Sequence, residues 1–133
     1  MAMEFRFRHT MLPVGDLDRS VDFYTRLLGM SLVRERRSSP TPTAYVAYGP
    51  EDTHPALELI AGTRDAGAAW RGHIAISVSD LRALAATLEK SGIVFSKPVR
   101  EGGPGSAGAY YANILDPDGF EIELTQPRLD ANA

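Results

Sequence analysis

The chain has 133 residues, of which 44% are apolar, and a formal net charge of −3. This length suits one ordinary domain, and the apolar fraction is enough to build its core without cross-links. The slightly acidic balance argues against a nucleic-acid partner, and the lack of cysteine excludes disulfides, thiolate metal ligands and a cysteine nucleophile. No segment has the apolar length of a signal peptide or a membrane span, so we expect a cytoplasmic protein that does not contact a membrane.

The first half of the chain predicts one strand, one helix and three further strands. Residues alternate between apolar and polar from His9, and Asp16 then stands where the N-cap of a helix is expected. Apolar residues recur at helical spacing over 17–28, and Gly29 follows where a left-handed glycine ends a helix. The alternating runs SLVRERR (31–37), TAYVAYG (43–49) and PALELIA (55–61) predict the three strands.

The second half repeats this plan. HIAISV (73–78) predicts a strand, Ser79 or Asp80 a helix cap, LRALAATLEKS (81–91) a helix, and Gly92 its end. The runs IVFSKPV (93–99), AGAYYANIL (107–115) and FEIELTQ (120–126) predict three strands. A repeat this long that occurs only twice is not a solenoid, and it indicates two fused modules with a boundary within 62–69.

Each half also carries a histidine on its predicted first strand and a glutamate in its otherwise apolar last strand. These are His9 and Glu58 in the first half, separated by 49 residues, and His73 and Glu123 in the second, separated by 50. Two imidazoles and two carboxylates would balance a divalent ion and leave positions open for substrate. A lone histidine or glutamate on a strand is more often structural, so the prediction of a metal site depends on the repetition.

Other polar and aromatic residues are interpreted as structural. His54 has no counterpart in the other half and is expected at the surface, while Trp70 is expected to fill a core or an interface. The run RERR (34–37) is expected to be the solvated end of a strand, with binding of an anionic substrate as the alternative. DPDG (116–119) predicts a tight turn that orients the last strand and so aims Glu123.

The phrases HTMLPVGDLDRSVDFYTRLLGM (9–30), ALEL (56–59), GHIAISV (72–78) and DPDGFEIEL (116–124) resemble the glyoxalase I (lactoylglutathione lyase) branch of the vicinal oxygen chelate superfamily. The resemblance covers residues 7–126 and implies an α+β fold, in which two βαβββ modules form curved mixed sheets around a metal cleft that is usually completed in a homodimer. One such domain would span residues 1–133, with modules at 5–62 and 69–127.

The resemblance also implies a reaction and the residues that perform it. The family's four metal ligands match His9, Glu58, His73 and Glu123 one by one. By the same match Glu123 is the base that moves a proton from C1 to C2 in the hemithioacetal of methylglyoxal and a thiol, glutathione or a similar one, to give a 2-hydroxyacyl thioester. Glu58 would assist at the opposite face. The implied cofactor is one divalent ion per site, with nickel or cobalt favoured by resemblance to compact bacterial members and zinc, manganese or iron as alternatives.

Two positions depart from the family pattern. Typical members carry an arginine four residues after the first ligand, where this chain has Pro13, and an asparagine four residues after the second, where it has Gly62. We therefore assign no substrate-binding residue; four arginines at neighbouring positions are candidates for the missing cation, namely Arg6, Arg8, Arg64 and Arg71. Two other functions stay open: a superfamily metalloenzyme acting on another small substrate, as an epimerase or a dioxygenase, and a small-molecule-binding resistance protein.

Overall fold

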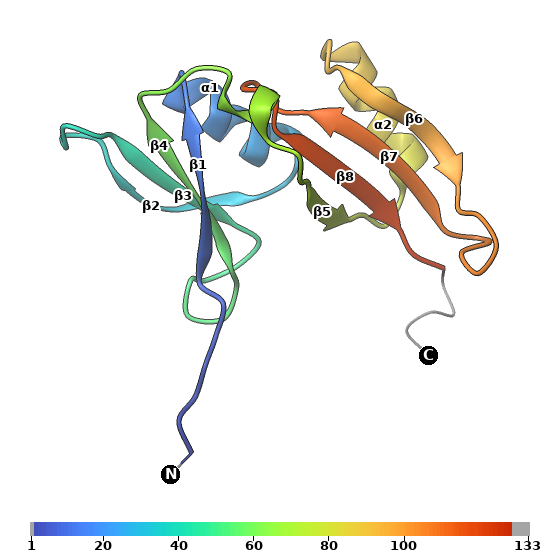
Figure 1. Ribbon diagram of the computed structural model, residues 1–133, viewed down its shortest axis with the longest axis horizontal. Coiled ribbons are helices and arrows are strands. Elements are labelled where there is room, and N and C mark those ends of the chain that lie inside the picture. The colour runs from blue at the N-terminus through green and yellow to red at the C-terminus, as the bar shows by residue number, and fades with distance from the viewer. Residues whose placement is uncertain (1, 129–133) are drawn as a thin grey trace. The chain divides into compact units, whose positions relative to one another are not determined.

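The computed structural model in Figure 1 describes residues 2–128. The first half contains β1 (His9–Val14), α1 (Leu17–Asp22), the π-helical η1 (Phe23–Leu27), β2 (Ser31–Arg36), β3 (Thr43–Ala47) and β4 (Ala56–Ala61). The second contains β5 (Ile74–Ser77), α2 (Leu81–Lys90), β6 (Phe95–Glu101), β7 (Tyr110–Leu115) and β8 (Glu121–Gln126), and the short 3-10 helix η2 (Ala66–Ala69) precedes it. The predicted order of strand, helix and three strands is therefore present twice.

The chain divides between Ala66 and Gly67 into two compact units, called here the first and the second unit. Each unit has a four-stranded mixed sheet, with strand order β1-β4-β3-β2 in the first and β5-β8-β7-β6 in the second. In both, the first strand runs parallel to the last strand, and the other pairs are antiparallel. The predicted α+β fold of paired βαβββ units is confirmed.

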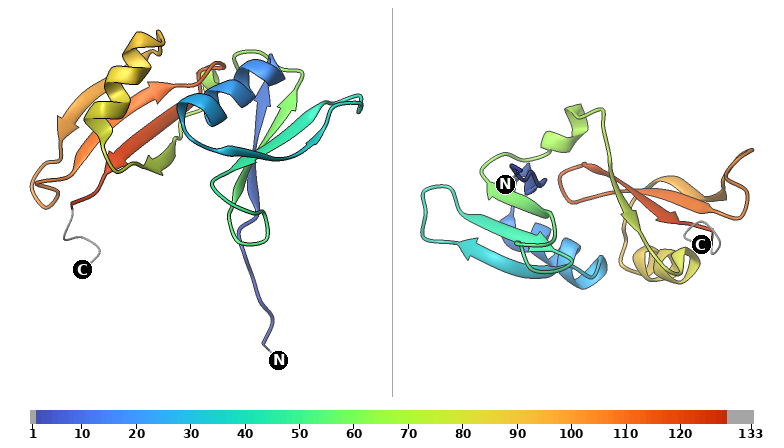
Figure 2. Two further views of the ribbon diagram at one scale, coloured as in Figure 1. Left: turned by 180° about the vertical axis from the view of Figure 1, so that it is seen from behind. Right: turned by 90° about the horizontal axis from the view of Figure 1, so that it is seen from below.

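In the first unit, one face of the sheet is covered by the helical segment, which contacts β3 and β4 (Figure 2). Leu12, Val14 and Leu59 point to this face and are at most 2% exposed. Asp16 caps α1 as predicted, because its side chain accepts a hydrogen bond from the backbone amide of Arg19. These contacts leave the opposite face of the sheet to carry polar side chains.

The helix predicted over 17–28 is α-helical only as far as Asp22. It then widens into η1, where the Leu28 amide donates to the Phe23 carbonyl, five residues earlier. The wider turn accompanies burial of the two neighbouring aromatic residues Phe23 and Tyr24. The chain leaves the helix at Gly29, whose φ of 76° confirms the predicted left-handed end.

In the second unit, α2 covers its own sheet and packs on β6, β7 and β8. Its buried residues are Leu81, Ala85 and Leu88, which recur at helical spacing. Of the two predicted caps, Asp80 is the one used, and its side chain accepts from the Ala83 amide. Gly92, with φ 74°, ends this helix as predicted. Within residues 2–128 no helix is long and apolar enough to cross a membrane.

Candidate metal centre

His9 and Glu58 lie on neighbouring strands of the first unit, on the face that the helix leaves uncovered. β1 runs parallel to β4 with Met11 beside Glu58, so His9 stands two residues before the partner of the glutamate. Residues two apart on a strand point to the same side. His9 Nε2 and Glu58 Oε1 are 3.5 Å apart, and the histidine side chain is the more exposed of the two, 38% against 14%.

The second unit repeats this arrangement with His73 and Glu123. β5 runs parallel to β8 with Ala75 beside Glu123, and His73 again stands two residues before that partner. His73 Nε2 and Glu123 Oε2 are 3.6 Å apart. β5 begins at Ile74, one residue later than predicted, so His73 immediately precedes the strand instead of lying on it. Both predicted His–Glu pairs are thus brought together by the same pairing of strands.

The donor atoms of each pair lie slightly farther apart than two ligands of one divalent ion would. Their separations of 3.5 and 3.6 Å exceed those of hydrogen-bonded atoms, which lie about 2.7–3.2 Å apart. Two ligand atoms that each lie about 2.1 Å from one ion are about 3.0–3.4 Å apart in octahedral and tetrahedral sites. No group of three or more histidines and carboxylates that could hold an ion is found among residues 2–128. Each His–Glu pair by itself therefore supplies two of the four ligands that the sequence predicts.

Glu58 has a hydrogen-bond partner on the adjacent strand. Tyr45 of β3 is paired with Glu58 of β4, and its hydroxyl donates to Glu58 Oε2. This hydrogen bond to Glu58, together with burial, raises the pKa of Tyr45 above its ordinary value. Arg34 lies over the tyrosine ring and forms an ion pair with Glu51, and the hydrogen bond from Arg34 lowers the pKa of Glu51. None of these three residues was predicted as part of the site from the sequence, where Arg34 was considered only within the run RERR (34–37).

Glu123 has different neighbours. Asn113 of β7 is paired with Glu123 of β8, but its Oδ1 accepts a hydrogen bond from Arg100, at 3.0 Å. Glu121, two residues before Glu123 on the same strand, accepts from the Ser96 hydroxyl at 3.0 Å. Within residues 2–128 no side-chain hydrogen bond to Glu123 is found. The two candidate carboxylates therefore differ in how firmly they are held.

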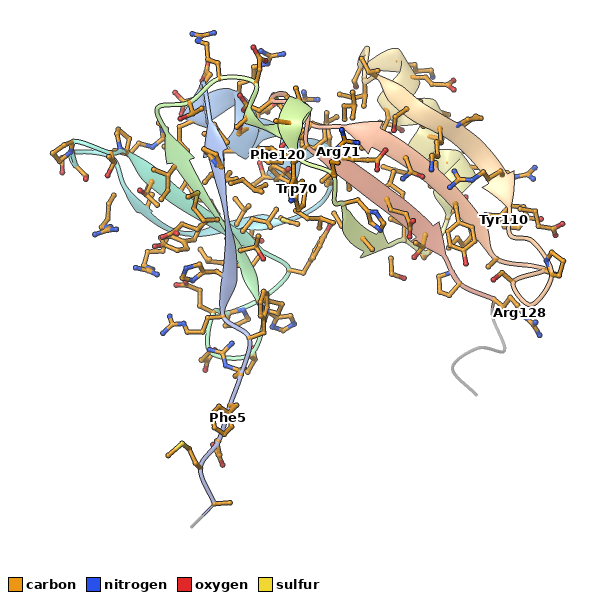
Figure 3. The ribbon with its side chains drawn as sticks, in the orientation of Figure 1. Phe5, Trp70, Arg71, Tyr110, Phe120 and Arg128 are labelled. Carbon is orange, nitrogen blue, oxygen red and sulfur yellow. The ribbon has the colours of Figure 1, made fainter. Side chains whose placement is uncertain are left out.

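The predicted turn at 116–119 is confirmed. Asp116 Oδ1 accepts from the backbone amides of Asp118 and Phe120, and Gly119 has φ 87°. Trp70 packs edge-on against Phe120 with ring centroids 5.4 Å apart (Figure 3), but it is 40% exposed, so the expectation that it fills a core is wrong. The turn and this aromatic contact together fix the chain where β8 begins.

Other predicted positions have structural surroundings. Pro13 lies on the same face of β1 as His9, and Gly62 has φ 142° with no atom within 4 Å of the place where a β-carbon would stand. The side chain of Arg64 packs over Gly15, where a β-carbon would come within 2.5 Å of Cγ. His54 is exposed, as predicted.

The comparisons with known proteins agree with this architecture. The profile of the Glyoxalase/Bleomycin resistance protein/Dioxygenase superfamily matches residues 6–124. The chain is 40% identical to the probable lactoylglutathione lyase of Vibrio cholerae over 128 residues, which are 91% of this chain and 90% of the relative.

Two solved structures are similar over nearly the whole chain. The trypanothione-dependent glyoxalase I of Leishmania major has a TM-score of 0.72 and 36% identity, covering 92% of this chain and 87% of that one. Glyoxalase I from Zea mays has a TM-score of 0.78 and 31% identity over 92% of this chain, which spans about half of the maize chain, 45%. The chain therefore belongs to the glyoxalase/bleomycin resistance protein/dioxygenase superfamily, in its glyoxalase I (lactoylglutathione lyase) branch.

Proposed function

We propose that this protein is a metal-dependent lactoylglutathione lyase, which converts the hemithioacetal of methylglyoxal and glutathione to a 2-hydroxyacyl thioester. The observation that carries the proposal is the repeated His–Glu arrangement, at 3.5 and 3.6 Å, in a chain that aligns with such a lyase over 91% of its length. The proposed ligands of one divalent ion are His9 and Glu58 of a first unit, and His73 and Glu123 of a second unit.

The proposed reaction is an isomerisation that moves the hydrogen of C1 to C2 and the hydroxyl proton from the oxygen on C1 to the oxygen on C2, so it needs no redox partner. The ion, when bound, polarises two neighbouring substrate oxygens and makes the hydrogen on C1 acidic. Glu123 takes this proton from C1 and returns it to C2, so the carboxylate ends the cycle as it began. Glu58 is the second carboxylate and would assist at the opposite face. His9 and His73 would each bind the ion through the lone pair of one ring nitrogen.

Nickel or cobalt is the ion that we favour, with zinc, manganese and iron as alternatives. Imidazole and carboxylate ligands bind all of these ions, so the ligand types do not decide which one is used. Reloading the metal-free protein with each ion in turn measures the preference. A homodimer and a cytoplasmic location are part of the same proposal. Analytical ultracentrifugation of the holoprotein tests the first, and fractionation of the source cells tests the second.

The decisive experiment is a spectrophotometric assay of thioester formation. Protein stripped of metal is reloaded separately with Ni(II), Co(II), Zn(II) and Mn(II), and is given methylglyoxal with either glutathione or trypanothione. Turnover restored by at least one ion is expected. The two thiols are compared because Pro13 and Gly62 replace residues usual at the glutathione contacts. Stoichiometric metal binding without turnover with either thiol would contradict the lyase and favour another substrate or a binding role.

The role of Glu123 has a matched control two residues away. Replacing Glu123 with glutamine removes the proposed base, and we expect kcat to fall by about 10²–10⁴-fold. Replacing Glu121 with glutamine removes the same charge from the same strand, where the Ser96 hydroxyl donates to the carboxylate, and should leave kcat within a few-fold. Equal losses in the two variants would mean that charge on β8, and not a base at Glu123, supports the reaction.

A further inference from the structure

The two oxygens of Glu58 have different partners. Oε2 accepts the hydroxyl hydrogen of Tyr45, which is its cross-strand neighbour, and Oε1 is the oxygen that lies 3.5 Å from His9 Nε2. Tilting the carboxylate out of this orientation would therefore break the hydrogen bond with the tyrosine, whereas a half-turn would only exchange two equivalent oxygens. The contact selects one oxygen to face the histidine and leaves the other occupied.

Tyr45 is itself held firmly. The residue is 3% exposed, and the guanidinium of Arg34 lies 3.9 Å from the centre of its ring. Two hydrogen bonds to Glu51, at 3.0 and 3.2 Å, fix that guanidinium in turn. The ring of His9 meets the tyrosine edge-on, with centroids 5.8 Å apart. Because these contacts already restrict the side chain, the hydroxyl can hold Glu58 at little further cost in conformational entropy.

Among residues 2–128, no side chain of the second unit donates a hydrogen bond to Glu123 as Tyr45 does to Glu58. Asn113 is the cross-strand neighbour of Glu123, as Tyr45 is of Glu58, but its carbonyl oxygen is directed to Arg100. The repeated fold thus places one carboxylate beside a fixed donor and the other beside a residue that is bonded elsewhere. The difference comes from the residue on the third strand of each unit and not from the His–Glu geometry, which is nearly the same in both.

We propose that Tyr45 is a positioning residue, which holds one oxygen of Glu58 and so orients this carboxylate toward the proposed ion. This inference rests on the proposed function, because it assumes that Glu58 binds the ion. Partners that orient a ligand from outside the coordination shell typically contribute about 10–100-fold to metal affinity. Removing the tyrosine hydroxyl should therefore weaken binding of the ion and leave the proposed base, Glu123, unchanged.

The test measures metal affinity instead of activity. Dissociation constants for Co(II) are determined by competition with a chelator, and visible spectra of the Co(II) forms are recorded, for wild type, Tyr45→Phe and Tyr48→Phe. Tyr48 is the matched control because its hydroxyl donates to the Leu28 carbonyl, at 2.6 Å, far in sequence from any proposed ligand. We expect a rise in the dissociation constant of about tenfold or more, with an altered spectrum, in Tyr45→Phe only.

A further pair of variants shows whether Tyr45 acts through Glu58. In a Glu58→Ala background the tyrosine has no carboxylate to hold, so adding Tyr45→Phe should leave the dissociation constant within twofold. Unchanged affinity and spectrum in Tyr45→Phe, or an equal effect with and without Glu58, would overturn the inference while the lyase stands. Failure of the wild type to bind Co(II) would instead overturn the proposed function, and the inference with it.

Discussion

The free energy of unfolding of Asp116 variants tests whether this side chain holds the turn that precedes β8. Its Oδ1 accepts two backbone hydrogen bonds, from Asp118 and Phe120, each 2.9 Å long, and the residue is 5% exposed. Asp116 also pairs through its own backbone with Phe120 and Gly119. Replacing Asp116 with alanine would leave two amide donors in the turn without their acceptor, immediately before the strand that carries Glu123.

The expected loss follows from these two contacts. A hydrogen bond to a charged group contributes about 1.5–3 kcal/mol, so deleting both should lower the free energy of unfolding by about 3–6 kcal/mol. Replacing Asp116 with asparagine keeps an oxygen that accepts both amides but removes the charge. Because neutral hydrogen bonds are about half as strong, this variant should lose about 1.5–3 kcal/mol.

Urea unfolding followed by circular dichroism measures both variants against the wild type. The reasoning requires a clear order, with Asp116→Ala the least stable and Asp116→Asn between it and the wild type. A loss below about 1 kcal/mol in Asp116→Ala, or equal losses in the two variants, would refute the argument that the carboxylate oxygen holds the turn.

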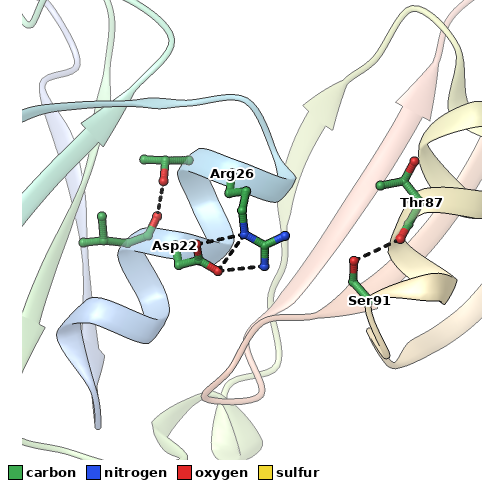
Figure 4. A network of polar contacts seen from close by, with 6 residues as sticks. Asp22, Arg26, Thr87 and Ser91 are labelled. Carbon is green, nitrogen blue, oxygen red and sulfur yellow. Dashed lines mark hydrogen bonds and ion pairs between the residues drawn. The ribbon is translucent and has the colours of Figure 1, made fainter.

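Three further predictions concern the frame of the two units. Leu88→Ala removes a side chain with 0% exposure from α2 and should cost about 2–5 kcal/mol in urea unfolding; a loss under 1 kcal/mol would contradict the packing. Gly92→Ala should cost about 1–2 kcal/mol because φ is 74°, although no atom lies within 4 Å, whereas Gly103→Ala, also in open space but without such a φ, should be nearly neutral. The hydrogen bond from Arg26 lowers the pKa of Asp22 below 3.8 (Figure 4), so this pair stabilises the fold above that pH and ceases to do so as the pH falls through the lowered pKa. Melting temperatures of wild type and Asp22→Asn should therefore differ at pH 7 and converge in acid, and a constant difference would contradict the assignment.

Local signals in the sequence predict most of the fold. Asp16 is read correctly as a cap, and so are the helix ends at Gly29 and Gly92, because a cap or a left-handed glycine depends only on its immediate neighbours. The change from α-helix to π-helix after Asp22, which accompanies burial of Phe23 and Tyr24, is missed because helical spacing of apolar residues does not distinguish the two helix types.

The candidate site is only partly visible in the sequence. The His–Glu pairs can be found because duplication repeats their spacing. Tyr45 cannot be found in this way. It precedes Glu58 by 13 residues, while Asn113 precedes Glu123 by 10, so these two positions on the third strands are not separated by the same distance as the ligands are. Their equivalence appears only in the antiparallel register of each strand pair, in which both residues stand directly opposite a glutamate.

The register of β4 predicts that this site tolerates changes in loop length better than shifts of the strand. Glu58 shares a face with Met11 and Tyr45, its neighbours on either side, while Leu59 points to the covered face and is 0% exposed. A shift of β4 by one residue would exchange these faces, burying a carboxylate under the helix and exposing a leucine. Both the core and the donor pair therefore select the same register. The connection between β3 and β4 can change in length without this cost, provided that Glu58 still pairs with Tyr45.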